Sequence, residues 1–140
     1  MSALEPVMTL DELSSFFVEA FPAHGQTNHR FDRIEPGWLR STMIPSDDML
    51  RPGQLVSGPS QMALADRVAY AVILAHIGPV AMAVTSNLNM SFLRPVLVKP
   101  VFADAYLIKL GKRLATVDVG LWQDSENTPV AQATVTYAIP

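Results

Sequence analysis

The chain has 140 residues, enough for one domain with a substantial core. Charged residues make up 16% of it, the formal net charge is -3 and no basic run is present, so the composition argues against a nucleic-acid partner. The chain contains no cysteine, which excludes disulfides, thiolate nucleophiles and cysteine-ligated metals. The low charge content also suggests that part of the surface is buried in an oligomer.

No apolar run is both long enough and free enough of charge to cross a bilayer. The N-terminus lacks the basic start and continuous apolar core of a signal peptide. We therefore expect a cytoplasmic protein that does not enter the membrane. His24, His29 and His76 have no metal-ligand spacing, so they are expected to be solvated or core histidines, and no metal site is predicted.

The N-terminal part of the chain predicts a helix followed by a loop. Residues 9–21 have the apolar stripe of an amphipathic helix, Thr9 and Glu12 have capping-box spacing, and Pro22 ends the pattern. We assign residues 1–27 to this helix and its loop.

A strand pair and a long loop come next. Residues 31–35 and 38–44 predict two strands joined by a tight turn at Pro36-Gly37. Residues 45–57 predict a loop that is long enough to be mobile or functional.

The stretch from Ser57 to Gly78 predicts one long helix around which the rest of the chain is organised. Ser57 or Gly58 can cap this helix, Pro59 suits its first position and Gly78 ends it, which places it at residues 59–77. The helix is apolar almost all the way round, which indicates that other structure wraps it.

Asp66 is the exception on this helix. An unpaired buried aspartate is costly, and the positions three and four residues away hold no base. Those neighbours are Met62, Ala63, Ala69 and Tyr70. Two interpretations stay open: Asp66 lies at an exposed edge or pairs with an arginine, or it belongs to a functional site.

Four strands are predicted after the helix. They span residues 80–93, 101–110, 114–122 and 130–139. Their short connections favour an antiparallel meander. The predicted fold is α+β: one antiparallel six-stranded sheet wraps one long central helix, with an N-terminal helix in front. We expect a single domain, 1–140, in which the sheet and central helix occupy residues 28–139.

Three segments carry a resemblance to a known family. Ser57-Gly58-Pro59, followed by Leu64-Ala65-Asp66, is similar to a His-Gly-Gly motif with a helix acid seven residues after it. Residues 85–95 are similar to a strand that ends in Phe-Leu-Arg-Pro, and residues 111–114 with 130–134 to a glycine-basic hairpin and a closing strand. Together they resemble the hotdog-fold acyl-CoA thioesterase superfamily, in its PaaI-like, phenylacetate-pathway branch.

The resemblance implies hydrolysis of an acyl-CoA thioester to the free acid and CoA. It implies that Asp66 is the nucleophile or general base, that the Gly58 backbone N–H polarises the thioester carbonyl, and that Thr85, or less readily Ser86, holds the attacking water. A helix N-terminus suits the second role, because its free N–H groups and partial positive charge stabilise an oxyanion. The resemblance implies no cofactor beyond the coenzyme A of the substrate.

Three residues depart from the family pattern at or shortly before the helix start. Ser57 replaces the motif histidine, and Pro59, which has no N–H, replaces the second glycine. Arg51 stands where the family often has a polar residue such as asparagine. Arg51 could pair with Asp66 or contact an anionic part of the ligand.

Residues for substrate and CoA binding follow from the same motifs and from the need of CoA phosphates for basic partners. They are Arg51, Ser57, Ser86, Asn87, Arg94, Lys112 and Arg113. Lys112 and Arg113 form the pair at a hairpin tip.

Other functions and an oligomer are also considered. A non-catalytic acyl-CoA or fatty-acyl binding protein on the same fold is an alternative, because the helix-start motif is altered. A hotdog hydratase or dehydratase is a weaker one, because the chemistry usually needs a histidine that position 57 lacks. The resemblance implies a homodimer, or a homotetramer of paired dimers, as the partner state.

Overall fold

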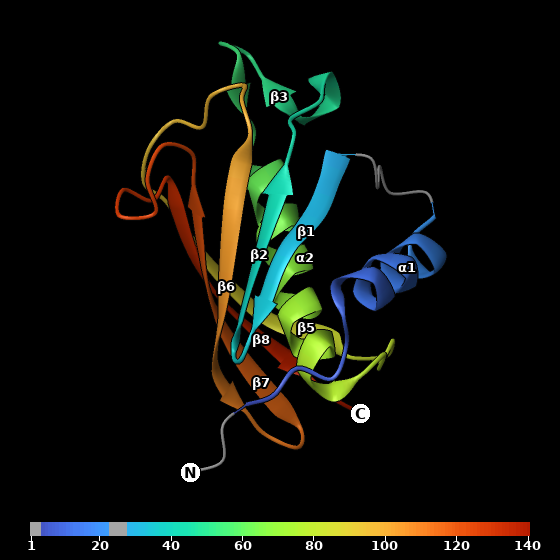
Figure 1. The fold of residues 1–140 in the computed structure, drawn as a ribbon. Helices are drawn as coiled ribbons and strands as arrows, with labels where there is room; N and C mark the ends of the chain where they lie inside the picture. Colours follow the sequence, from blue (N-terminus) through green and yellow to red (C-terminus); the bar gives the residue numbers. More distant parts are fainter. Residues whose placement is uncertain (1–3, 23–27) are drawn as a thin grey trace.

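The computed structural model describes residues 4–22 and 28–140 and shows one curved sheet around one long helix (Figure 1). The predicted helix–two strands–helix–four strands order is confirmed. The elements are α1 (Leu10–Ala20), β1 (His29–Glu35), β2 (Trp38–Met43), the 3₁₀ turn η2 (Asp47–Met49), β3 (Leu50–Arg51), β4 (Leu55–Val56), α2 (Gly58–Ile77), β5 (Val84–Phe92), β6 (Val101–Leu110), β7 (Leu114–Trp122) and β8 (Ala131–Ala138).

The main sheet has six strands in the order β1-β2-β6-β7-β8-β5, and every neighbouring pair is antiparallel. Three details differ from the prediction. The four strands after α2 were expected to form a meander, but only β6, β7 and β8 do, because β5 pairs with β8 at the sheet edge and not with β6. The segment expected to be a loop, residues 45–57, also forms η2 and the β3–β4 hairpin, whose strands are too short to show an alternating pattern. The strand expected from residue 80 begins at Val84, because the N–H groups of Val80 and Ala83 bond backward to Gly78 and Val80 in a turn.

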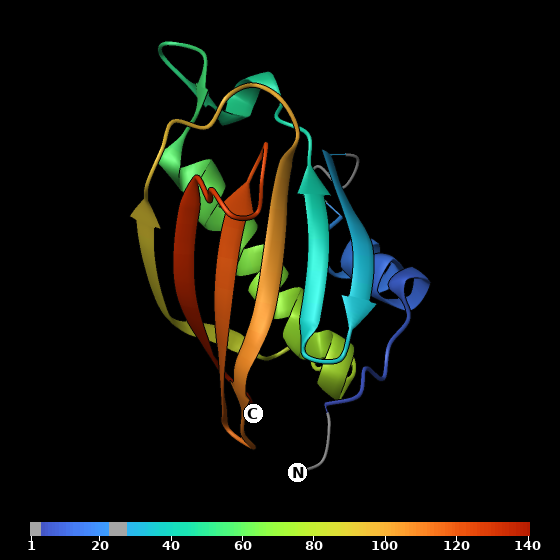
Figure 2. The same ribbon diagram turned by 60° about the vertical axis from the view of Figure 1, so that its left-hand side comes forward.

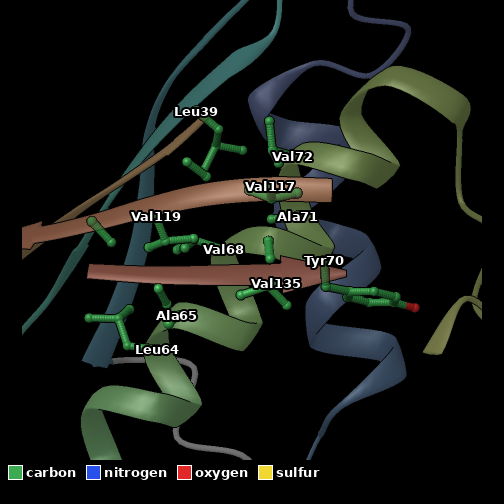
Figure 3. Packing of buried hydrophobic residues seen from close by; sticks show 14 of the residues in the cluster. Leu39, Leu64, Ala65, Val68, Tyr70, Ala71, Val72, Val117, Val119 and Val135 are labelled. Atoms are coloured by element: carbon green, nitrogen blue, oxygen red, sulfur yellow. The ribbon is translucent and has the colours of Figure 1, made fainter. Parts of the chain in front are cut away.

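Helix α2 ends before Gly78, as its punctuation predicts, and begins at Gly58, one residue before the predicted start at Pro59. The Ser57 side chain accepts a hydrogen bond from the Ser60 N–H at 3.3 Å, and Gly78 closes the helix with φ 96°, a conformation that favours glycine. Every residue from Val68 to His76 is buried. Figure 3 shows helix side chains such as Val68 meeting valines from β7 and β8. The absence of a polar face on α2 is thus explained by its wrapping.

Helix α1 packs beside the β1 edge of the sheet (Figure 2). The predicted capping box is confirmed, since Thr9 Oγ1 accepts from the Glu12 N–H at 3.1 Å and the Thr9 N–H donates to Glu12 at 2.9 Å. Leu13 and Phe17 are its buried side chains. No helix in the described part of the chain combines the length and apolar character needed to cross a membrane.

The two edges of the sheet differ in charge. Edge strand β1 carries two ion pairs, Arg30 with Asp32 at 2.6 Å and Arg33 with Glu35 at 3.0 Å. Edge strand β5 has no charged residue, and seven of its nine residues are exposed. Charged side chains discourage strand addition, and an uncharged exposed edge invites it. Strand β5 is therefore the edge that is open to pairing with another chain.

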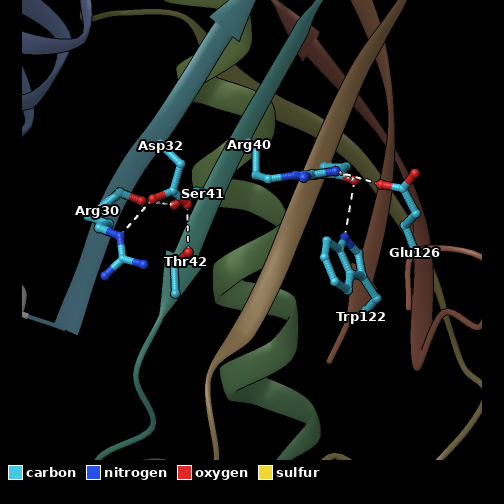
Figure 4. A network of polar contacts seen from close by, with 8 residues as sticks. Arg30, Asp32, Arg40, Ser41, Thr42, Trp122 and Glu126 are labelled. Carbon is cyan, nitrogen blue, oxygen red and sulfur yellow. Dashed lines mark hydrogen bonds and ion pairs between the residues drawn. The ribbon is translucent and has the colours of Figure 1, made fainter. Parts of the chain in front are cut away.

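A polar cluster fastens three strands on the face of the sheet opposite α2 (Figure 4). The Arg40 guanidinium contacts the buried Asp104 carboxylate at 2.6 and 2.9 Å and Glu126 at 2.6 Å. It lies between the rings of Trp38 and Trp122, 5.1 and 5.0 Å from their centroids. The hydrogen bond to Asp104 raises the pKa of Arg40 above its ordinary value.

His76 is a buried core histidine, as one of the two interpretations predicted. Its Nε2 accepts the Gly37 N–H at 2.9 Å, so Nδ1 carries the proton and donates to the Val72 carbonyl at 2.8 Å. The imidazole thereby ties the end of α2 to the β1–β2 turn. His29 begins β1, and His24 lies outside the described residues.

We predict that His76→Ala lowers the free energy of unfolding by about 2–4 kcal/mol, because it leaves the Gly37 N–H unpaired and opens a cavity. Urea unfolding measures this. The exposed Val18→Ala should stay within about 0.5 kcal/mol of wild type. A loss for His76→Ala no larger than that of the control would contradict this role.

Candidate active site

The acid predicted to carry the chemistry, Asp66, faces a cavity of about 580 Å³. This Asp66 cavity lies between α2, the start of β5, the end of β8 and helix α1. The helix contributes Phe17, and the residue that caps its C-terminus, Phe21, also lines the cavity. Tyr70 completes an aromatic wall with these two rings, at centroid distances of 5.7 and 5.9 Å. A half-buried carboxylate therefore faces a largely apolar chamber.

Two hydroxyl groups hold the Asp66 carboxylate by one oxygen. Thr85 Oγ1 donates to Oδ1 at 2.7 Å, and the Tyr137 phenol donates to the same Oδ1 at 2.8 Å. The phenol also lies 3.2 Å from the Asp66 backbone carbonyl. Of the two interpretations of Asp66, pairing with an arginine has no support among the described ion pairs, and the carboxylate instead has neutral partners.

Thr85 and Ser86 lie at an irregular point of β5. The β5–β8 register passes from Thr85 opposite Tyr137 to Asn87 opposite Thr136, so Ser86 is the extra residue of a bulge. Thr85 thereby sits beside Tyr137 and reaches Asp66. Ser86 and Asn87 are exposed on the edge strand, and neither has a described contact with Asp66.

Gly58 lies at the N-terminal end of α2, away from Asp66. It is the first residue of α2 and lines a separate cavity of about 400 Å³, the Gly58 cavity, with Arg51, Phe92 and Arg94. Gly58 and Asp66 are eight residues apart on α2, about 12 Å along the helix axis. Within one chain, the predicted oxyanion donor and the predicted base do not share a cavity.

The cation predicted to reach either Asp66 or the ligand lies near the helix start. Arg51 is exposed on β3, lines the Gly58 cavity, and its Nε donates to the Pro52 carbonyl at 3.2 Å. Ser57, at the position of the motif histidine, is used as the helix cap, and its hydroxyl also donates to Ser60 Oγ at 3.0 Å.

The remaining basic candidates divide between the two ends of the sheet. Arg94 lines the Gly58 cavity and donates to the Pro129 carbonyl. Lys112 and Arg113 form the β6–β7 turn, next to Leu114, which pairs with Ala138 on β8. Ala138 also pairs with Val84, so this turn lies at the Thr85 end of β5.

Comparison with known families decides the identity of the fold. A profile of the thioesterase superfamily matches residues 53–130, more than half of the chain. The chain belongs to the thioesterase superfamily.

Three relatives agree with this membership. The solved structure of an inferred thioesterase of Silicibacter sp. TM1040 has 38% identity and a TM-score of 0.88, over 98% of this chain and 95% of that chain. An inferred thioesterase of Ralstonia eutropha JMP134, related to phenylacetic acid degradation, has 29% identity and a TM-score of 0.78, over 89% of this chain and 98% of that chain. An inferred esterase of Thermoplasma acidophilum is 32% identical over 61% of this chain, which spans 64% of that relative's length.

These similarities confirm the hotdog fold and the resemblance to the phenylacetate-related thioesterases. Membership of the superfamily supports an enzyme that hydrolyses thioesters. The sequence patterns missed Tyr137, because it lies 71 residues from Asp66. A signal was available: Tyr137 shares the inward side of β8 with Ala133 and Val135, so it had to face the helix that carries the acid.

Burial changes the pKa values of two residues beside Asp66, Arg67 and Tyr137. The next residue, Arg67, lies over the Phe17 and Phe31 rings at 4.6 and 5.4 Å, and burial lowers its pKa to about 10, which leaves it charged at neutral pH. Burial also raises the pKa of Tyr137 well above the ordinary value of 10.0, and the Asp66 charge adds to this. At neutral pH the phenol is therefore a hydrogen-bond donor.

We predict that the protein loses stability as the pH rises above about 10. The folded-state pKa of Tyr137 exceeds the unfolded-state value, so its contribution is present below the unfolded pKa and lost as the pH rises through the folded one. Urea unfolding against pH should show this loss, and Tyr137→Phe should reduce it. Phenolate absorbance that titrates identically in the native and unfolded protein would contradict the raised pKa.

Proposed function

We propose that this protein hydrolyses an acyl-CoA thioester to the free acid and CoA, at a site built by two copies of the chain. The proposal is carried by the positions of two groups, which lie at opposite ends of strand β5. Asp66, held by two hydroxyls, faces the Asp66 cavity at the start of β5, and the N-terminus of α2 at Gly58 lies by the end of the same strand.

Strand β5 offers the means to unite the two halves. At its start, Thr85 bonds to Asp66; at its end, Phe92 lies against Gly58, where an added Cβ would be 3.5 Å from the ring. Two β5 edges that pair antiparallel about a two-fold axis place the start of one opposite the end of the other. Asp66 of one chain then meets the partner's Gly58. The uncharged, exposed β5 edge supports this pairing.

The chemistry follows from these two groups. Asp66 accepts a proton from water as the water oxygen attacks the thioester carbonyl carbon, or its carboxylate attacks that carbon directly. The carbonyl oxygen takes up the negative charge and accepts a hydrogen bond from the Gly58 N–H, at the positive end of the α2 dipole. The C–S bond then breaks and CoA leaves as a thiolate, which takes up the proton held by Asp66 when water was the nucleophile. When the carboxylate attacked, water then hydrolyses the acyl–Asp66 anhydride, which releases the free acid and restores the carboxylate. Thr85 donates its hydrogen to Asp66, so its oxygen can still accept a hydrogen bond from the water.

The same pairing gathers the basic residues. Arg51 and Arg94 line the Gly58 cavity of one chain, and Lys112 and Arg113 lie at the Thr85 end of the other, so both sets border one mouth and can bind CoA phosphates. A hotdog-like protein of Streptococcus mutans, with 22% identity and a TM-score of 0.71, has been solved bound to acetyl CoA, which supports a CoA ligand here. The acyl group then occupies the Asp66 cavity.

We predict that the wild type releases thiol from at least one member of a panel of aliphatic and aromatic acyl-CoAs, and that Asp66→Ala loses activity by about 100-fold or more, the scale of a lost acid–base group. Asp118→Ala, a carboxylate change on the opposite face of the sheet, serves as the control and should keep the activity. If the wild type and Asp66→Ala are equally inert but calorimetry still detects acyl-CoA binding, the protein is a binding protein and the proposal fails.

We predict that Gly58→Pro lowers kcat by about 100- to 1,000-fold, the scale of a lost oxyanion donor, because proline removes the N–H. Proline suits the first helical position, and the extended Ser57 before it (φ -68°, ψ 154°) is compatible with a following proline. Gly58→Ala keeps the N–H, and its Cβ makes only ordinary contact with Phe92, so this matched control should stay close to wild type. Equal rates for the two variants would exclude the Gly58 N–H as the oxyanion donor.

A further inference from the structure

We propose that Tyr137 is a positioning residue that, together with Thr85, fixes Oδ1 of Asp66 and so presents Oδ2 to the substrate. This inference rests on the proposed function, because it assigns roles to the two oxygens of the catalytic carboxylate.

The asymmetry of the carboxylate carries the inference. Both hydroxyl donors bond to Oδ1, at 2.7 Å from Thr85 and 2.8 Å from Tyr137. Within residues 4–22 and 28–140, no hydrogen bond reaches Oδ2. A carboxylate oxygen with two donors has less electron density to offer a proton or a carbonyl carbon than one without donors. Oδ2 is therefore the oxygen that takes the proton of water or attacks the thioester.

The phenol fixes the side-chain rotation of Asp66 as well. Its oxygen lies 2.8 Å from Oδ1 and 3.2 Å from the backbone carbonyl of the same residue. The phenol, which belongs to β8 and not to α2, therefore fixes the position of the carboxylate relative to the backbone of the helix. The Thr85 hydroxyl, which comes from the neighbouring strand β5, completes the clamp, because Thr85 and Tyr137 are register partners.

Tyr137 is itself rigidly held. Its side chain is 3% exposed, and its ring stacks on Tyr70 with centroids 5.6 Å apart and planes at 27°. Tyr70 is anchored in turn by its hydroxyl, which donates to the Ala81 carbonyl at 3.0 Å, and by the rings of α1. A catalytic side chain needs supporting groups of this kind if its geometry is to be maintained.

The raised pKa of Tyr137 agrees with this role. Burial keeps the phenol protonated at every pH at which the enzyme is expected to work, so its hydrogen stays available to Asp66. A tyrosine that acted as an acid in the reaction would instead need a pKa near the working pH.

The test compares kcat and KM for an acyl-CoA that the wild type hydrolyses. Tyr137→Phe removes only the hydroxyl, and we expect kcat to fall about 10- to 100-fold, the scale of a hydrogen bond to a charged group, with KM within about two-fold of wild type. In an Asp66→Asn background the same change should cause no further loss, because the phenol acts through Asp66. Tyr106→Phe, which removes a hydroxyl on the opposite face of the sheet, should leave both parameters unchanged.

The outcomes separate this inference from the function on which it rests. A wild type without turnover on any acyl-CoA refutes the proposed function. An active wild type, an inactive Asp66→Asn and an unaffected Tyr137→Phe refute only the role of Tyr137, as does an equal loss in the Asp66→Asn background. If Tyr137→Phe does not fold, Thr85→Val and Thr85→Ser test the other half of the clamp. If the Thr85 and Tyr137 hydroxyls hold Asp66 together, kcat falls in Thr85→Val and is retained in Thr85→Ser. Equal kcat values for these two variants overturn the inference.

Discussion

The burial of α2 on all sides from Val68 to His76 is the constraint on which the rest of the structure depends. A helix with no polar face is stable only when other elements cover it, and here the sheet wraps it and α1 closes part of the remaining side. The same wrapping leaves α2 few places to present a polar group. Those places are its first turn at Gly58 and the half-buried turn at Asp66 and Arg67. The candidate chemistry uses both.

The straightness of one helix is the reason why the proposed site needs two chains. Gly58 and Asp66 cannot approach each other along α2, since the helix holds them about 12 Å apart. Strand β5 runs beside this helix with Thr85 near the acid and Phe92 near the glycine. Because the β1 edge is charged and the β5 edge is not, a second chain is expected to pair with β5. In this account the fold and the catalytic arrangement share one cause.

The sequence predicted the parts that depend on local patterns. Thr9 and Glu12 marked the start of α1, Ser57 and Gly78 marked the ends of α2, and alternation or turn residues marked the six strands of the sheet. Asp66 stood out because a carboxylate inside an apolar helix conflicts with its surroundings. The two-residue strands β3 and β4 were missed, since no pattern can be seen over so short a run.

Local sequence patterns could not predict the tertiary contacts of the site. The pairing of Tyr137 with Asp66 depends on how β8 lies across α2, and the separation of the basic residues into two groups depends on the strand order. Thr85 was predicted from a family resemblance, yet its hydrogen bond to Oδ1 required the bulge at Ser86. Distances between elements, rather than residue types, set these features.

Complementation between two damaged variants tests the central claim, that each site takes Asp66 from one chain and Gly58 from the other. Asp66→Asn and Gly58→Pro would be purified separately, mixed, and allowed to exchange subunits, with exchange followed by native mass spectrometry. Each mixed dimer then contains one site with both groups intact, so activity should return to about a quarter of wild type when half of the dimers are mixed. Exchange without any return of activity would show that both groups serve a site within one chain, and would contradict the account.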